Sequence, residues 1–235
     1  MALLSTEDQA QVRHMFEAMT NPVRIVLFTD SRPDRGCQYC DDTLQIVEEV
    51  ATLSSKIAVE PHDLATEPEV AALYGVDRAP AIAIVQVTED GQASKDFGLR
   101  FYGIPSGYEF VTLLEDVVMV STGEASLSPT TRAWLSTLAK PVHLQVFVTP
   151  TCPYCPQMVQ LAHKLAVASP LIRADGVEAT EFPELADKYE VYGVPRTVVS
   201  AEGGKDQHIE GAVPEAKLLA ALQKAVGGKL VIASR

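Results

Sequence analysis

The sequence predicts an α/β protein made of two tandem copies of one fold, each copy a central mixed β-sheet flanked by helices. Two observations carry this prediction. The four cysteines of the 235-residue chain fall into two CxxC pairs, CQYC at 37–40 and CPYC at 152–155. Residues 37–80 also align with residues 152–195 without a gap, with 13 identities over 44 positions. A repeat of this period is longer than those of coiled coils and short solenoids, so it indicates two homologous domains.

The likeness between the copies continues on both sides of the aligned stretch. Upstream, NPVRIVLFTD resembles KPVHLQVFVTP, and downstream FYGIPSGYEFVTLLEDVV parallels IEGAVPEAKLLAALQKAV. The length differences fall in turn-rich segments, where copies of one fold tolerate insertions. Ser, Thr and Gly in STGEASLSP at 121–129 suggest a linker, and Ser128-Pro129 is a typical helix N-cap and first helical residue. We therefore expect domains at 1–120 and 121–235.

Each copy predicts the same order of elements, because apolar residues recur at helical or strand spacing in matching segments. In order, the elements are a leading helix between Val12 and Met19 or between Trp134 and Leu138, a strand (VRIVLF; VHLQVFV), the CxxC turn, a helix (DDTLQIVEEVATLS; PQMVQLAHKLAVAS), a second strand (KIAVE; LIRAD), a helix beginning at Pro68 or Pro183, a hairpin (PAIAIVQV to ASKDFGLRFYG; RTVVSAEG to KDQHIEGA) and a closing helix over 106–118 or 214–226.

Charge and hydropathy exclude several classes of function. The net charge of −12 lies entirely in residues 1–120, which hold 8 basic and 20 acidic residues, whereas residues 121–235 hold 11 of each. No basic footprint for a phosphate backbone is present, so we expect no nucleic-acid partner. No apolar run reaches membrane-spanning length, and MALLSTEDQAQVR lacks the regions of a signal peptide. We therefore expect a cytoplasmic protein that has no membrane partner.

The chemistry of a dithiol fits the turn between the first strand and the following helix. A thiolate attacks disulfides, and the unpaired N–H groups at a helix N-terminus favour the anion. The second cysteine of the pair lies one helical turn further on and can attack the mixed disulfide that the first one forms. We therefore expect Cys37 and Cys152 to attack, and Cys40 and Cys155 to resolve.

The element order, the CxxC position and a Val-x-x-x-Pro run ending 40 residues after the second cysteine of each copy resemble the thioredoxin/glutaredoxin superfamily. CPYC is the usual glutaredoxin tetrapeptide. Two such thioredoxin-like units in one chain resemble the glutaredoxin-like protein disulfide oxidoreductases of hyperthermophilic archaea and bacteria, a protein disulfide isomerase-like family. The resemblance covers nearly the whole chain, and it implies that the disulfides of protein substrates are reduced, formed or isomerised.

The resemblance also implies which residues bind the substrate chain. Pro80 and Pro195 would be cis-prolines facing the dithiols, and the preceding residues, Ala79 and Val194, would offer backbone hydrogen bonds to the substrate. One position departs from the pattern, because Val146 or a neighbour stands where many thioredoxins carry a buried acid.

The third position of each CxxC motif holds a tyrosine, Tyr39 or Tyr154. We expect these tyrosines to shield the disulfide from solvent at the substrate-binding surface rather than only to fill the core.

Other functions for the cysteines remain open on the sequence alone. Four thiolates could form one zinc site, and some glutaredoxins bridge an iron–sulfur cluster. We expect neither a metal nor a bound organic cofactor, because the pairs occupy equivalent places in two copies. Electrons would then come from a thioredoxin-reductase-like flavoenzyme or a small thiol. An electron relay to a peroxiredoxin is an enzymatic alternative, and a chaperone-like peptide binder is a non-enzymatic one.

Overall fold

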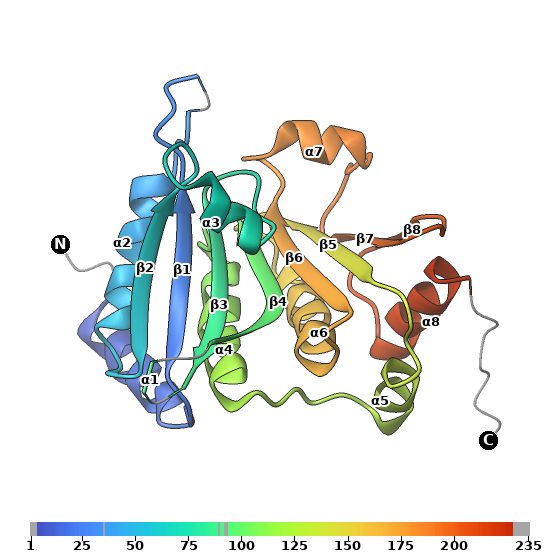
Figure 1. The fold of residues 1–235 in the computed structure, drawn as a ribbon, viewed down its shortest axis with the longest axis horizontal. Coiled ribbons are helices and arrows are strands. Elements are labelled where there is room, and N and C mark those ends of the chain that lie inside the picture. The colour runs from blue at the N-terminus through green and yellow to red at the C-terminus, as the bar shows by residue number, and fades with distance from the viewer. Residues whose placement is uncertain (1–3, 35, 89, 92–93, 228–235) are drawn as a thin grey trace. The chain divides into compact units, whose positions relative to one another are not determined.

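The computed structural model describes residues 4–34, 36–88, 90–91 and 94–227, and the chain divides into two compact units (Figure 1). The expected domain boundary between residues 120 and 121 falls inside a helix, Tyr108–Thr122, and it stays a prediction. Unit 1 comprises Met1–Asp96, Arg100–Pro105 and Leu113–Gly123, and unit 2 comprises Phe97–Leu99, Ser106–Thr112 and Glu124–Arg235.

Unit 1 is built on a mixed sheet with the strand order β2-β1-β3-β4. Strand β1 pairs parallel with β2 and antiparallel with β3, and β3 pairs antiparallel with β4. Two of its elements, β4 and α4, also contribute residues to unit 2. The elements are α1 (Thr6–Phe16), β1 (Val23–Thr29), α2 (Cys40–Ala51), β2 (Ile57–Asp63), α3 (Pro68–Leu73), β3 (Ala81–Val87), β4 (Ser94–Tyr102) and α4 (Tyr108–Thr122).

Unit 2 repeats this topology, with the strand order β6-β5-β7-β8. Strand β5 pairs parallel with β6 and antiparallel with β7, which pairs antiparallel with β8. The predicted α/β class, with a mixed sheet and flanking helices in each copy, is confirmed. The elements are α5 (Pro129–Leu135), β5 (Val142–Val148), α6 (Cys155–Ala168), β6 (Ile172–Glu178), α7 (Pro183–Lys188), β7 (Arg196–Ala201), β8 (Gln207–Glu210) and α8 (Glu215–Ala225).

Local sequence signals place several helix starts. Ser128 is the N-cap of α5, and its side chain accepts a hydrogen bond from the Thr131 N–H, as the Ser-Pro pair predicts. Pro68 and Pro183 lie at the first turns of α3 and α7, where a missing N–H costs nothing. These helix starts could therefore be predicted from caps and prolines.

The ends of several helices differ from the sequence prediction. Met19 and Leu138 lie beyond the ends of α1 and α5, in turns that follow each helix. The closing helices begin at Tyr108 and Glu215, because the first residues of the predicted segments form the preceding loop. Within the described ranges, no helix combines the length and the apolar character that crossing a membrane requires.

The core of each unit surrounds its central strand. In β1, the side chains of Ile25, Leu27 and Phe28 are fully buried, and Leu144 and Phe147 are fully buried in β5. Both strands are near-continuous apolar runs because a neighbour pairs on each edge and helices cover the faces. Burying one such side chain contributes about 1.5–3 kcal/mol, so these strands fix the frame that holds the CxxC turns.

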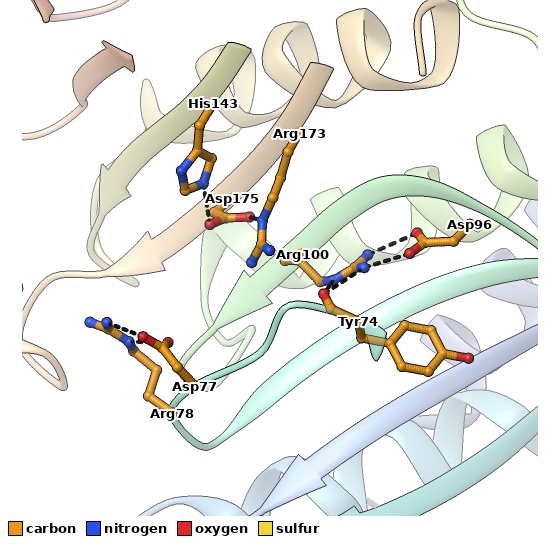
Figure 2. Close-up of polar contacts among 8 residues, drawn as sticks. All are labelled: Tyr74, Asp77, Arg78, Asp96, Arg100, His143, Arg173 and Asp175. Atoms are coloured by element: carbon orange, nitrogen blue, oxygen red, sulfur yellow. Dashed lines mark hydrogen bonds and ion pairs between the residues drawn. The ribbon is translucent and has the colours of Figure 1, made fainter. Parts of the chain in front are cut away.

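A buried arginine ties the end of α3 to β4 in unit 1 (Figure 2). The Arg100 side chain is 3% exposed, and its Nη1 and Nη2 atoms donate to the two carboxylate oxygens of Asp96. Its Nε and Nη2 atoms also donate to the Tyr74 carbonyl, the C-cap of α3. A buried charge with its hydrogen bonds satisfied is tolerated, and here it positions the loop that follows Tyr74.

A buried carboxylate plays the corresponding part in unit 2 (Figure 2). Asp175 on β6 lies 2.6 Å from His143 Nε2 and 2.9 Å from Arg173 Nε. Burial alone would raise the pKa of Asp175, but the hydrogen bonds and charges of His143 and Arg173 outweigh it and hold that pKa below its usual value. The cluster therefore keeps Asp175 ionised at neutral pH.

Candidate active site

Strand register brings each CxxC turn beside its proline. In unit 2, Phe147 on β5 pairs with Arg196, the first residue of β7. Pro195 therefore lies next to Val148, four residues before Cys152. Both segments leave the sheet at the carboxyl end of β5.

Unit 1 has the same arrangement with a longer connection. Phe28 on β1 pairs with Ala81, so Pro80 lies next to Thr29. The loop from Asp30 to Gly36 then leads to the first cysteine. The sheet geometry thus produces two equivalent sites from one local plan.

The four cysteines form two disulfides, Cys37–Cys40 and Cys152–Cys155, each with a Cα–Cα distance of 5.5 Å. Sequence reasoning placed the first cysteine at the helix start, but helices α2 and α6 begin at the second cysteine of each pair. The first cysteine lies in the turn before the helix. Because the disulfide joins the two Sγ atoms, the first sulfur still lies beside the unpaired N–H groups of the helix N-terminus.

Exposure differs between the two cysteines of each pair. Cys155 is fully buried and Cys152 is 7% exposed, whereas in unit 1 Cys40 is 7% exposed and Cys37 is half-buried. In both units the first cysteine is the more accessible one. This order agrees with attack by the first cysteine and resolution by the second, and these roles stay predictions.

The peptide bonds Ala79–Pro80 and Val194–Pro195 are cis, as the family resemblance implied. The carbonyl groups of Pro80 and Pro195 accept hydrogen bonds from the N–H groups of Gly103 and Gly211. Their role in substrate binding stays a prediction.

The residue before each cis-proline has free backbone groups. In the part of the chain that the structure describes, the N–H and carbonyl groups of Ala79 and Val194 make no hydrogen bond. Free backbone groups beside a reactive sulfur can pair with an extended peptide.

Charged side chains surround the first site. Arg32 Nε and Nη2 donate to Asp30, and this hydrogen bond raises the pKa of Arg32. Asp63, the last residue of β2, accepts from the N–H groups of Ala65 and Ser31, which lower its pKa. Asp41 and Asp42 occupy the first turn of α2. Arg32 is therefore already neutralised by Asp30 and offsets little of the acidic helix start. Arg35, the other basic residue before the first cysteine, lies outside the described residues.

The second site has a buried carboxylate at the position equivalent to Asp63. Glu178 is the last residue of β6, pairs in register with Val148, and is 4% exposed. One of its oxygens accepts from the Thr180 hydroxyl and from the Glu181 N–H. Sequence reasoning missed this residue, although the offset of 115 residues places an acid at the same point of both copies.

A second buried acid belongs to unit 2. The Tyr108 N–H donates to the carbonyl of Pro150, two residues before Cys152, at 3.1 Å. This contact sets the first turn of α4 against the loop that carries Cys152, and Glu109 in that turn is buried. No local pattern signals this, because the contact joins residues 42 positions apart. Val146 is apolar and fully buried, so the acids of this site come from other elements.

The two tyrosines of the motifs differ in exposure. Tyr154 is 67% exposed, and Tyr39 is half-buried. Contact between either ring and the disulfide stays a prediction. Among the described residues, no group of three or more His, Cys, Asp and Glu side chains is arranged to hold a metal ion.

Solved structures with the same architecture are similar over nearly the whole chain. A protein disulfide oxidoreductase from Aeropyrum pernix K1 is 27% identical, with a TM-score of 0.82, covering 98% of this chain and 97% of that one. The NTD_N/C domain of alkylhydroperoxide reductase AhpF from Enterococcus faecalis is 26% identical, with a TM-score of 0.80, covering 93% and 99%. A thioredoxin domain model matches residues 142–224.

Curated relatives are longer than this chain. An NADH dehydrogenase of Bacillus subtilis (strain 168) is 26% identical over 200 residues, 85% of this chain and 35% of that protein. The alkyl hydroperoxide reductase AhpF of Xanthomonas campestris pv. phaseoli is 24% identical over 201 residues, 85% of this chain and 34% of that protein. The chain thus spans about a third of the length of these relatives.

Proposed function

The chain is a tandem thioredoxin-fold disulfide oxidoreductase with one CxxC pair in each unit, and we propose that both pairs exchange disulfides with protein substrates. The observation that carries this proposal is the repeated site. Each unit presents a disulfide at a helix start, next to a cis-proline whose preceding residue has free backbone groups. Two copies of the whole arrangement support chemistry at both sites.

The proposed reaction follows from the positions of the sulfur atoms. In the reduced protein, the thiolate of Cys152 attacks one sulfur of a substrate disulfide and releases the other substrate sulfur as a thiolate. The thiolate of Cys155 then attacks Cys152 and releases the second substrate sulfur. The substrate gains two electrons, and the Cys152–Cys155 disulfide forms. Cys37 and Cys40 would perform the same steps in unit 1, and reversal of the steps oxidises a substrate dithiol.

The free backbone of Ala79 and Val194 would hold the substrate during these steps. An extended substrate segment can add to these groups as a short strand, which places its sulfur at the first cysteine. A thioredoxin-reductase-like flavoenzyme or a small thiol would return the chain to the dithiol form. No step needs a cofactor bound to this chain.

A second candidate function is an electron relay from a flavoenzyme to a peroxiredoxin. The similarity to alkylhydroperoxide reductase AhpF favours this candidate. It uses the same dithiols and differs only in the partner. Mixing the reduced chain with an oxidised 2-Cys peroxiredoxin tests it, since a relay reduces the peroxiredoxin at least ten times faster than it reduces insulin.

An insulin-reduction assay with dithiothreitol tests the main proposal. The intact chain and each single-site variant, Cys37→Ser/Cys40→Ser or Cys152→Ser/Cys155→Ser, should accelerate precipitation of the insulin B chain. The variant without all four cysteines should match dithiothreitol alone. That variant also tests the chaperone-like alternative, because a peptide binder keeps its effect on insulin without cysteines. Acceleration that persists without cysteines would overturn the proposal.

A further inference from the structure

Two exposed tyrosines lie on the segments that frame the second dithiol. Tyr192 is 93% exposed and Tyr154 is 67% exposed, in a unit whose other large apolar side chains are mostly buried. Tyr154 lies between the two cysteines of CPYC, and Tyr192 lies three residues before the cis-proline Pro195. Exposed aromatic rings on both segments that carry the reactive groups mark a contact surface.

The first site has different side chains at the matching position. The offset of 115 residues places Asp77 opposite Tyr192 and Arg78 opposite Gly193. Arg78 Nε and Nη2 donate to the two carboxylate oxygens of Asp77, both at 2.9 Å (Figure 2). The Arg78 guanidinium carbon also lies 5.9 Å from the ring centroid of Tyr102. The segment before Pro80 is therefore an ion pair, whereas its counterpart in unit 2 is aromatic.

Backbone pairing determines which part of a substrate meets these side chains. Val194 has free backbone groups and lies two residues after Tyr192. A substrate strand that pairs with Val194 and delivers its sulfur to Cys152 must run along the segment that carries Tyr192. The residues flanking the substrate cysteine, one or two positions away in the extended strand, then lie alongside Tyr192 and Tyr154.

We infer that the second dithiol selects protein disulfides whose cysteine is flanked by an apolar or aromatic residue, and that Tyr192 with Tyr154 determines this selectivity. The inference rests on the proposed thiol–disulfide exchange. Covering exposed rings with an apolar side chain removes apolar surface from water, and aromatic contacts add to that gain. The Asp77–Arg78 ion pair offers no such gain, so the first dithiol does not share the preference.

Matched peptides test this inference in the full-length chain. The protein carries Cys37→Ser/Cys40→Ser, so that only the second dithiol reacts, and dithiothreitol sustains turnover. Two peptides contain one intramolecular disulfide and differ only at the residue before the first cysteine, which is leucine or glycine. We expect a KM about threefold to tenfold lower for the leucine peptide, with the same kcat.

Variants at one position then assign the effect. Tyr192→Ala and Tyr192→Asp should remove the difference in KM and leave the rate on the glycine peptide unchanged, whereas Tyr192→Phe should keep it. Leu73→Ala, which alters another exposed large apolar residue but in unit 1, serves as the control and should change nothing. The chain with only the first dithiol should treat both peptides alike.

The outcomes separate the inference from the proposed function. If the second dithiol reduces neither peptide, the exchange reaction itself is wrong. Equal KM values for the two peptides, or a preference for leucine that survives Tyr192→Ala, would overturn the selectivity and leave the exchange reaction standing.

Discussion

At the scale of single residues, the first cysteine of each pair is the more exposed one and the second is the more protected one. This difference gives the two sulfurs different tasks. An accessible thiolate can reach a substrate disulfide, whereas a buried thiolate can reach only the sulfur beside it. The mixed disulfide with the substrate must therefore form on the first cysteine and persist when the second is removed.

Cys155→Ser should trap Cys152 in mixed disulfides with protein substrates. We expect thiol-sensitive adducts on non-reducing gels, in the Cys37→Ser/Cys40→Ser background that silences unit 1. The matched variant Cys152→Ser should give at least ten times fewer adducts, because Cys155 is fully buried. Adducts on Cys155 but none on Cys152 would show that the two roles are reversed.

Gly107→Ala should impair the second site by displacing the loop before Cys152. Gly107 has a φ of +60°, and a Cβ there would lie 2.2 Å from the Pro150 carbonyl oxygen. We expect a loss of about 3 kcal/mol in unfolding free energy, or local rearrangement with lost activity at the second dithiol. Denaturant titration and single-site insulin assays measure the two effects.

Gly203→Ala is the matched control for this variant. Gly203 has a φ of +70°, but a Cβ there would meet no atom within 4 Å. It should cost only the conformational term, about 1 kcal/mol, with the second dithiol fully active. Equal effects of the two variants would mean that the contact with Pro150 does not hold the loop.

At the scale of elements, helices α2 and α6 give the two dithiols different electrostatic surroundings. The first turn of α2 contains Asp41 and Asp42, whereas the first turn of α6 contains no acid. Carboxylates near a thiolate disfavour it, and Arg32 is already paired with Asp30. We therefore expect the second dithiol to be the more reactive and the more oxidising.

Thiol titration of the single-site variants measures this asymmetry. Cys152 should form its thiolate at a lower pH than Cys37, and the second disulfide should have the higher reduction potential, since a stabilised thiolate stabilises the reduced form. The gap should shrink at high salt, which screens the more distant charges. Thiolate formation at lower pH on Cys37 would contradict this account of α2.

Strand β2 contains a histidine whose contribution to stability depends on pH. Burial lowers the pKa of His62, but hydrogen bonds to Glu67 and Glu60 outweigh it and the net pKa is raised. The stabilisation is therefore fully present below about pH 6.5, the unfolded value, and is lost as the pH rises through the folded pKa.

His62→Gln should accordingly cost about 1 kcal/mol of unfolding free energy at pH 5.5 and less at pH 9. Denaturant titration at the two pH values measures the difference. His14→Gln is the control, because the His14–Glu17 pair is exposed and should contribute little at either pH. A cost for His62→Gln that is equal at both pH values, or larger at pH 9, would contradict the ionic role.

Elements defined by local signals were predictable from the sequence. The CxxC turns and the helices at Pro68 and Pro183 depend on neighbouring residues, and the repeat gave each prediction twice. Helix ends were less accurate, because Met19 and Leu138 are apolar residues that lie in a turn rather than in the helix. The cis-prolines came from family resemblance, since no local pattern of these residues requires the cis form.

The parts of the site that depend on distant contacts could not be predicted. The Tyr108–Pro150 hydrogen bond and the burial of Glu109 join segments that no sequence period relates. Glu178 differs, because its match with Asp63 in the repeat was visible. That match pointed to a shared role at the end of the second strand, where both acids accept backbone N–H groups.

At the scale of the whole molecule, duplication has preserved the reactive framework and changed its surroundings. Both units keep the disulfide, the cis-proline and the free backbone before it. They differ in net charge, in the acids at the helix start, and in the residues at positions 77 and 192. Two equivalent reactions with different substrates or potentials are the expected consequence of this pattern.

The central claim is that both dithiols exchange electrons directly with protein disulfides. Its most direct test mixes the fully reduced chain with excess insulin, quenches with acid, alkylates the free thiols, and maps the disulfides by mass spectrometry. We expect Cys37–Cys40 and Cys152–Cys155 disulfides to form at the same rate as insulin thiols appear, one chain disulfide for each insulin disulfide reduced. Insulin thiols that appear without either chain disulfide, or one pair that stays reduced throughout, would contradict the account.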